Sequence, residues 1–403
     1  MLLRVLSLLI VGMAVNIYIP VAPSILGALV DYQGLSLDVA GRLISYNFWG
    51  ATASTVVAIF ILHRPGWNLR TTMLVCLLLV VVTSGASVWF AGNVPALAAV
   101  RFVNGLGAGL GFTVSCVAAV STPRIERTYA VLYGSPFLIS GAGLAFLPYV
   151  YQVAGIEGAF YGMGLINLLA IAMLPFFPRS VLNPDDASGA SIHGPERGTR
   201  ILVMLALTAL LLHYVFNSGI WAYFERLGVA AGMAPETAGV ILGPAMSAAI
   251  VGMVAASILG DRLGYIKPIY IGLAVITAST FALLFSASEL VFGIGTALFN
   301  ASITFVTPYM IAILALLIPS GFGVTAANIA TVTGFSAGPF LISFLIAGGD
   351  FTLSILVTAA GFVIVLILLM TFVRVLDLQI TGLDRLKTLC VGPVESITPS
   401  TRT

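Results

Sequence analysis

Residues 257–267 read SILGDRLGYIK, and a related segment, IFILHRPGWNL, stands 198 positions earlier (261 minus 63) at residues 59–69. Both segments join two long apolar stretches, and in both an arginine is followed two positions later by a glycine. Chance similarity between apolar helices explains matched alanines and glycines, but not an Arg-x-Gly at the same place in both polar breaks. We therefore interpret the chain as an internal repeat of two halves. The same shift pairs Asp38 with Glu236, Ala40 with Ala238 and Gly41 with Gly239.

The regions around this repeat have the composition of a membrane protein. The 403 residues are 60% hydrophobic and 8% charged, whereas soluble domains carry about 25% charged residues. A spanning helix needs roughly 20 mainly apolar residues, and twelve such stretches are separated by polar breaks. We therefore predict an all-α polytopic membrane protein. The predicted spans are 4–28, 38–62, 71–92, 95–121, 130–152, 157–177, 201–223, 236–260, 266–287, 290–318, 321–347 and 351–374.

The longest polar break divides the spans six and six. Residues 178–200 are rich in Pro, Gly, Ser and charge and are interpreted as a cytoplasmic linker. The linker separates an N-terminal six-helix bundle at 1–177 from a C-terminal bundle at 201–375, which a cytoplasmic tail at 376–403 follows. Lys and Arg near span ends stay on the cytoplasmic side, and here they gather at the N-terminus, in the even-numbered breaks and in the tail. We therefore expect both termini to be cytoplasmic, in a multi-pass protein of the inner (plasma) membrane.

The polar break at 257–267 resembles the signature of the major facilitator superfamily between helices two and three, Gly-x-x-x-Asp-Arg-x-Gly followed by two basic residues. Asp261, Arg262 and Gly264 match this signature. In the first half only Arg64 and Gly66 match, because a histidine replaces the aspartate. The resemblance implies two pseudo-symmetric bundles that alternate access to a central site, with these five residues as a conformational latch.

Helix four supports the same resemblance, because residues 97–109, LAAVRFVNGLGAG, are similar to the family's Leu-x-x-x-Arg-x-x-Gln-Gly-x-Gly pattern. Arg101, Gly105 and Gly107 match, and Asn104 replaces glutamine. The antiporter signature of helix five is not present, since 134–143 reads GSPFLISGAG. The direction of transport therefore stays open.

Ionisable residues inside spans are costly and mark functional candidates; Arg42, Arg101 and His213 are the three candidates. Arg101 is roughly 9 Å from the outer end of its helix at 1.5 Å per residue, so it either binds an anion or bonds carbonyls of a neighbouring helix. Arg42 either pairs with Asp38 one turn away at the surface or turns inward with Arg101. With no carboxylate deep in any span, the second alternative favours an anionic or zwitterionic solute.

His213 is the candidate for proton coupling, since imidazole titrates near neutrality; a hydrogen-bonded packing histidine is the alternative. It shares a helix face with Asn217 and Trp221. Further polar stripes on helices one, two and ten either wet a cavity or bond helices together. The candidate substrate-binding residues are Arg101, Arg42, Asn104, Tyr46, Asn16, Tyr18, His213, Asn217, Trp221, Asn300 and Thr304.

These features favour a secondary transporter for a small organic solute, with protons as the coupling ion. A multidrug or metabolite efflux antiporter, a transporter-like membrane sensor and a lipid-processing enzyme are the alternatives. An enzyme would need a carboxylate pair, a metal cluster or a nucleophile with its base, and the three histidines are scattered. We expect no catalytic residues, metal, cofactor or nucleic-acid partner, and we expect a monomer in the lipid bilayer.

Overall fold

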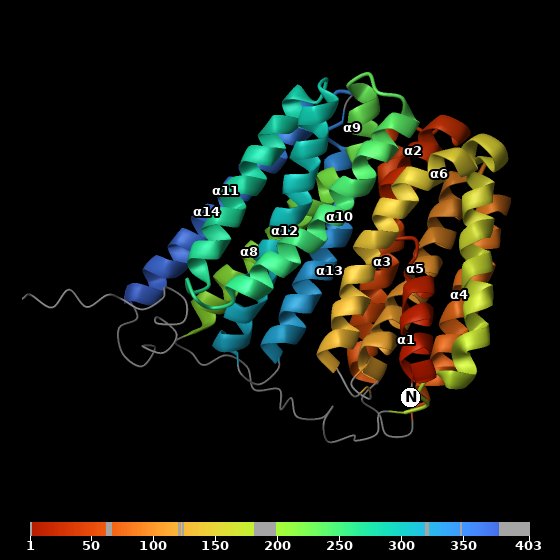
Figure 1. The fold of residues 1–403 in the computed structure, drawn as a ribbon, viewed down its shortest axis with the longest axis horizontal. Helices are drawn as coiled ribbons and strands as arrows, with labels where there is room; N and C mark the ends of the chain where they lie inside the picture. The colour runs from red at the N-terminus through yellow and green to blue at the C-terminus, as the bar shows by residue number, and fades with distance from the viewer. Residues whose placement is uncertain are drawn as a thin grey trace, which may run out of the picture.

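The computed structural model describes residues 2–61, 67–119, 122, 125–180, 199–318, 322–346 and 349–378. Most of these residues are helical (Figure 1). The N-terminal half contains α1 (Leu2–Val15), α2 (Ala22–Gln33), α3 (Leu37–Ile61), α4 (Leu69–Trp89), α5 (Val94–Ala119), α6 (Ile125–Ala170) and the 3-10 helix η1 (Ile171–Phe176). The C-terminal half contains α8 (Arg200–Trp221), α9 (Phe224–Ala230), α10 (Pro235–Leu259), α11 (Ile266–Ala282), η3 (Leu283–Phe285), α12 (Glu289–Leu317), α13 (Phe322–Ser343) and α14 (Thr352–Leu378).

Eight helices in the described ranges are each long and apolar enough to cross a membrane. One of them is α6, which makes two passages because Gly155 interrupts it with φ 61° and ψ −170°. Only glycine adopts such angles without strain. The pair α1 and α2 makes one further passage, and α3 and α13 complete the twelve. The predicted fold of two six-helix bundles is therefore confirmed.

The first passage differs from the continuous helix predicted over 4–28, because residues 16–21 form turns between α1 and α2. The amide of Ala22 donates to the carbonyl of Ile19 at 3.2 Å, a turn contact rather than a helical one. Pro20 lies in this interruption, and proline has no N–H to continue a helical ladder. Tyr18, Ile19 and Pro20 therefore take up positions that a straight helix would not give them.

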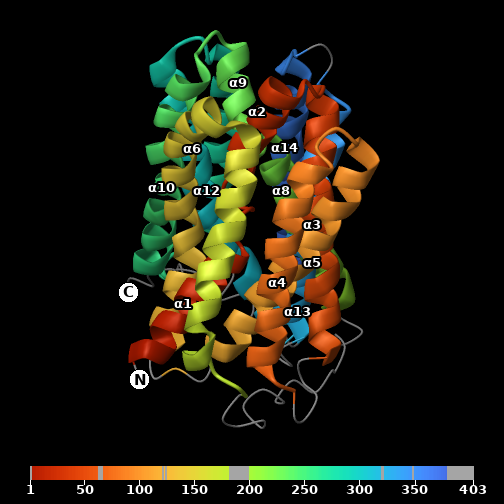
Figure 2. The same cartoon turned by 90° about the vertical axis from the view of Figure 1, so that its right-hand side faces the viewer.

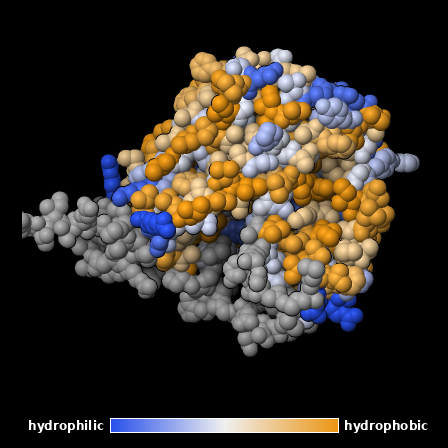
Figure 3. Space-filling view, viewed as in Figure 1, coloured by the Kyte–Doolittle hydropathy of each residue, from blue (hydrophilic) through white to orange (hydrophobic). Residues whose placement is uncertain are grey.

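The two halves lie side by side and are closest at the end that carries α2 and α9 (Figure 1), which is the upper end in Figure 2 as well. Toward the other end, where α1 begins, α8, α11 and α14 tilt away from the N-terminal half (Figure 1). The face in Figure 3 is mostly hydrophobic, with hydrophilic side chains gathered near its two ends, as expected of a chain surrounded by lipid.

Small residues allow the halves to approach along their length. A Cβ atom added to Gly141 in α6 would lie 2.5 Å from the carbonyl oxygen of Gly243 in α10 and 2.6 Å from Ser247 Oγ. On the other side, Ser45 of α3 donates to the carbonyl of Ser336 in α13 at 2.8 Å. These two seams, α6 with α10 and α3 with α13, enclose the space between the halves.

Candidate functional site

A cavity of about 630 Å³ lies between the two halves, within the size range typical of small-molecule sites. The N-terminal half contributes Ile19 and Pro20 from the interrupted first passage and part of α6. The C-terminal half contributes residues of α8, α10, α12 and α13. The lining residues are Ile19, Pro20, Tyr133, Pro136, Phe137, Ser140, Tyr214, Asn217, Trp221, Met246, Met253, Asn300, Ile303, Thr304, Thr307, Pro308, Ile311, Ala312 and Phe335. Both halves therefore form one site.

The cavity wall is mainly apolar and carries uncharged hydrogen-bonding groups. Asn300 donates to the carbonyl of Thr296 at 2.8 Å, which fixes its amide and leaves the side-chain oxygen available. Thr304 donates to the carbonyl of Ala249 at 2.6 Å. The indole N–H of Trp221 points to Met246 Sδ at 3.3 Å. None of the described residues that line the cavity is charged.

Four of the predicted binding residues lie on this wall: Asn217, Trp221, Asn300 and Thr304. Helical spacing identified these residues because α8 and α12 each present one continuous face to the cavity. The prediction missed the part of the wall that comes from Tyr133, Pro136, Phe137 and Ser140 of α6 and from Phe335 of α13. The four α6 residues follow one another at i, i+3, i+4 and i+7, so helical spacing could have identified this face too.

Arg101 lies inside the N-terminal half and is only 2% exposed. Its Nη1 donates to Ser87 at 3.0 Å and its Nη2 to Asn104 at 2.8 Å. The guanidinium carbon is 4.0 Å from the ring centre of Tyr18 and 5.2 Å from that of Phe160. The structure thus brings three of the candidate binding residues, Arg101, Asn104 and Tyr18, together, but within the bundle rather than on the cavity wall.

Asn104 extends this buried network. Asn47 donates to Asn104 Oδ1 at 2.9 Å, and the Asn104 amide donates to Thr83 at 2.8 Å. The network joins α3, α4 and α5, and no carboxylate contacts Arg101 among the described residues. The positive charge is therefore held by hydrogen bonds and aromatic faces.

Arg42 lies near the start of α3, partly exposed, where it forms a 2.5 Å ion pair with Asp38. Its guanidinium also stands 5.9 Å from the ring centre of Phe344. The surface pair that the sequence left as one of two alternatives is thus the arrangement found. Arg42 and Arg101 share no partner, so the alternative in which Arg42 turns inward with Arg101 is not the arrangement found.

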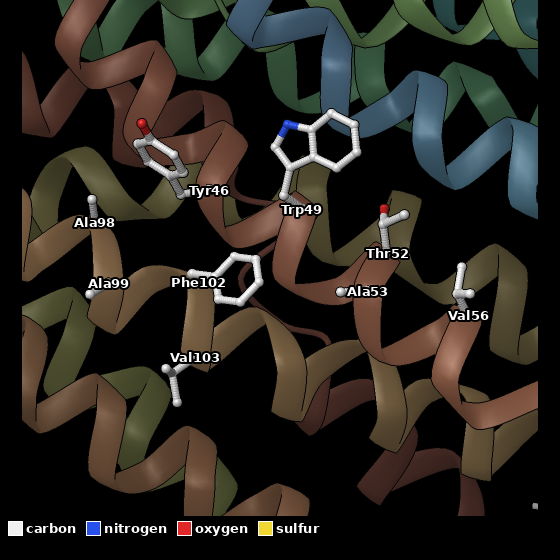
Figure 4. Close-up of a pocket in the computed structure, with 9 residues that line it drawn as sticks. All are labelled: Tyr46, Trp49, Thr52, Ala53, Val56, Ala98, Ala99, Phe102 and Val103. Atoms are coloured by element: carbon white, nitrogen blue, oxygen red, sulfur yellow. The ribbon is translucent and has the colours of Figure 1, made fainter. Parts of the chain in front are cut away.

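Tyr46 lines a second hollow, of about 770 Å³, whose lining residues all come from α3 and α5 of the N-terminal half (Figure 4). Tyr46, Trp49 and Thr52 follow one another along α3, opposite Ala98, Ala99 and Phe102 of α5 (Figure 4). Because one half alone makes this apolar groove, we do not assign the solute site to it despite its volume.

His213 is fully buried and is not among the residues that line the cavity. Its ring packs edge-on against Tyr214 and Phe362, with centroids 5.8 Å apart in each case. Neither ring nitrogen has a hydrogen-bond partner among the described residues. The packing contacts expected of a structural histidine are therefore present, but its expected hydrogen bond is absent among the described residues.

The remaining predicted residues that the structure describes lie away from the cavity. Asn16 stands half-buried at the start of the interruption. Asp261 and Arg262 are exposed in the turn between α10 and α11, where Gly264 has φ 69° and its amide donates to the Asp261 carbonyl at 2.9 Å. Arg64 and Gly66 lie outside the described residues.

Comparison with known proteins agrees with this architecture. The chain superposes on a crystal structure of the D-xylose-proton symporter with a TM-score of 0.71 and 15% identity, covering 91% of this chain and 96% of that one. It also superposes on the inward-open conformation of the xylose transporter XylE from E. coli, with a TM-score of 0.70, 15% identity and coverage of 91% and 94%. No curated protein sequence matches the chain. The sequence model of the major facilitator superfamily matches residues 5–320, and the chain therefore belongs to that superfamily.

Proposed function

We propose that the chain is a secondary transporter that moves an uncharged, amphiphilic small organic solute by alternating access. The single observation that carries this proposal is the composition of the cavity wall. Both halves line it, so a bound solute touches both moving parts. Its polar groups are amides, hydroxyls and one indole N–H, which orient a neutral solute without neutralising a charge.

The composition of the wall favours a neutral solute over the anionic or zwitterionic solute expected from the sequence. The preference for an anionic or zwitterionic solute required Arg101 and Arg42 at the site, and neither lines the cavity. A buried charge of the solute would meet no opposite charge there, and burying an unpaired ion is strongly unfavourable. The D-xylose-proton symporter is named for a sugar, which is a neutral solute. The apolar wall of this chain favours a ligand with a larger apolar surface than a sugar.

We propose proton coupling through His213, with the termini on the cytoplasmic side of the inner membrane. A buried imidazole with two unsatisfied nitrogens is costly and calls for an explanation, and a group that exchanges a proton during the cycle provides one. His213→Gln should abolish uptake driven by a pH gradient and leave solute counterflow intact. Unaltered pH-driven uptake would remove His213 from the mechanism.

Transport by purified protein in proteoliposomes tests the main proposal. A thermal-shift screen of neutral, anionic and cationic solutes should identify neutral amphiphiles, which are then measured by counterflow. Asn300→Ala should raise the KM for such a solute about tenfold, equivalent to about 1.4 kcal/mol. Asn167→Ala is the matched control, because Asn167 is also buried and also donates to a carbonyl of its own helix, at 2.9 Å, but lies off the cavity.

The outcome of the screen decides the solute class. Stabilisation only by anions would contradict an uncharged site, and an equal effect of Asn167→Ala and Asn300→Ala would show that the cavity wall does not bind the solute. Movement of the solute in the direction opposite to the proton flow would favour the efflux antiporter alternative.

A further inference from the structure

The end of the molecule that carries α9 contains a charged contact between the two halves. Arg226 of α9 binds Asp31 of α2 with both terminal nitrogens, at 2.7 Å and 2.8 Å. Such bidentate ion pairs are stronger and more directional than single hydrogen bonds. The Arg226 Nε also donates to Glu225 at 2.5 Å, and its Nη2 donates to the second oxygen of Glu225.

This contact is buried more deeply than an ordinary surface ion pair. Glu225 is 4% exposed and Arg226 is 5% exposed, although they lie in a short helix between two membrane passages. Glu225 reaches the backbone of α2 at Gly27, where any added Cβ would collide with its carboxylate. The absence of a side chain at Gly27 therefore allows Glu225 to pack against the opposite half and to orient Arg226 toward Asp31.

A second polar contact lies beside the first. Gln152 of α6 donates to Glu236 of α10 at 2.6 Å, again from one half to the other. A small hollow of about 80 Å³ between the two contacts is lined by Ser24, Asp31, Tyr32, Tyr151, Glu225 and Glu236, among others. The halves are thus joined at this end by polar groups rather than by apolar packing alone.

Among the described residues, the ion pairs are Arg42 with Asp38 and Arg226 with Asp31 and Glu225. Of these described ion pairs, only that of Arg226 with Asp31 joins the two halves. Because Arg226 and Asp31 belong to opposite halves, separation of the halves at this end requires this contact to break.

We propose that Asp31, Glu225 and Arg226 form a clamp, the α9 clamp, that holds this end of the molecule closed and opens once in each transport cycle. The inference rests on the alternation of the two halves that the proposed function assumes. It concerns a different site from the cavity wall, and it can be tested without knowledge of the solute.

The test measures the distance between the halves at this end by pulsed electron spin resonance. Spin labels are attached to Val153→Cys in α6, a position that is 90% exposed, and to Ala230→Cys in α9, which is also exposed. Cys76, Cys116 and Cys390 are first replaced by serine, so that no other thiol is labelled. Asp31→Asn then removes the charge of the bridging carboxylate without changing its shape.

Asp31→Asn should increase the ratio of separated to closed molecules about tenfold. That change corresponds to about 1.4 kcal/mol, near the lower end for bonds between charged groups because Asp31 is 37% exposed. Arg226→Lys should also increase the ratio of separated to closed molecules, since lysine keeps the charge but cannot form the bidentate pair. Glu289→Gln is the control, because it removes a carboxylate charge from the exposed first turn of α12 that forms no ion pair among the described residues.

Distance distributions of Asp31→Asn and Arg226→Lys that match those of the parent protein would overturn the proposal. So would an equal change in Glu289→Gln. Failure of the proposed function has a different signature: no solute would show counterflow, while Asp31→Asn would still separate the halves.

Discussion

Tyr18 and Arg101 should be energetically coupled by about 2 kcal/mol, the value for a cation and an aromatic face that are both removed from water. The guanidinium lies 4.0 Å from the ring centre of Tyr18, and the two side chains are 3% and 2% exposed. Tyr18 belongs to the interruption between α1 and α2, whose next two residues, Ile19 and Pro20, line the cavity. The pair therefore connects the interior of one half to the cavity wall.

A double-mutant cycle of Tyr18→Leu and Arg101→Met isolates this coupling. Tyr18→Leu leaves a buried cation without one of its two aromatic faces and should be strongly destabilising. Arg101→Met loses two hydrogen bonds but also removes a buried charge that has no carboxylate partner, so its net cost should be smaller. The double variant should lose about 2 kcal/mol less than the sum of the single variants.

The free energies are measured by unfolding in mixed detergent micelles with increasing SDS, followed by circular dichroism. Tyr18→Phe is the control, because it keeps the ring face and should keep most of the coupling. The cycle refutes the reasoning if the single effects add to within about 0.5 kcal/mol, the usual limit for independent sites. A KM that rises in Tyr18→Leu and stays unchanged in Tyr18→Phe would show that the interruption positions the cavity wall.

Three further substitutions test the contacts between and within the halves. Gly141→Val should abolish transport without loss of expression, since its side chain would meet the backbone of Gly243; Gly134→Val, which has open space around it, should transport normally in the same counterflow assay. Gly155→Ala should lower the free energy of unfolding by about 1 kcal/mol, and with it the Tm, because the φ of Gly155 is 61°. Gly162→Ala in the same helix should lower neither, and equal Tm values of the two variants would contradict the assigned turn. Thr52→Val removes a hydroxyl that lies 2.7 Å from Ser336 Oγ and 3.0 Å from the Val332 carbonyl across the α3–α13 seam, so it should weaken closure of the halves by about 1 kcal/mol in a spin-label measurement. Thr55→Val is the control, because its 3.5 Å contact with Thr113 stays within one half. Equal effects of the two substitutions would refute the role of the seam.

The positions of the spans were predictable because lipid imposes a simple rule on sequence. Every passage through a bilayer needs about 20 apolar residues, so the breaks of the sequence fall close to the ends of α3, α4, α5, α8, α10 and α12. The interruption at 16–21 was harder to predict. Proline is tolerated within α6, α10, α12 and α13 of this same protein, so Pro20 alone does not distinguish a break from a kink.

The faces of the cavity-lining helices α8 and α12 were predictable, but the partners of the charged residues were not. Spacing along α8 places Asn217 and Trp221 on one face, and the cavity lies there. Spacing along α5 likewise places Arg101 and Asn104 together, yet it cannot state whether that face meets the cavity or α4. The i,i+4 pair of Arg42 with Asp38 needed only local geometry and was anticipated as one alternative.

The α9 clamp had no local signal. Glu225 and Arg226 are neighbours in a helix of seven residues, and a charged dipeptide in a polar break ordinarily remains in water. Their burial depends on Gly27 and Asp31, nearly two hundred positions earlier in the chain. Only the tertiary contact of α2 with α9 shows that this break lies within the interface between the halves.

The proposed solute site and the α9 clamp use different chemistry, so substitutions in the one should not have the effects of substitutions in the other. The cavity wall offers uncharged groups, whereas the described ion pair that joins the halves lies in the α9 clamp. Asn300 and Asp31 share no hydrogen-bond partner, so Asn300→Ala should raise the KM without moving the distance between the halves, and Asp31→Asn should move that distance without changing the order of preference among solutes. In the double variant the two free-energy changes should add to within about 0.5 kcal/mol. A larger deviation, in either the KM or the distance measurement, would mean that solute contact itself sets the state of the clamp.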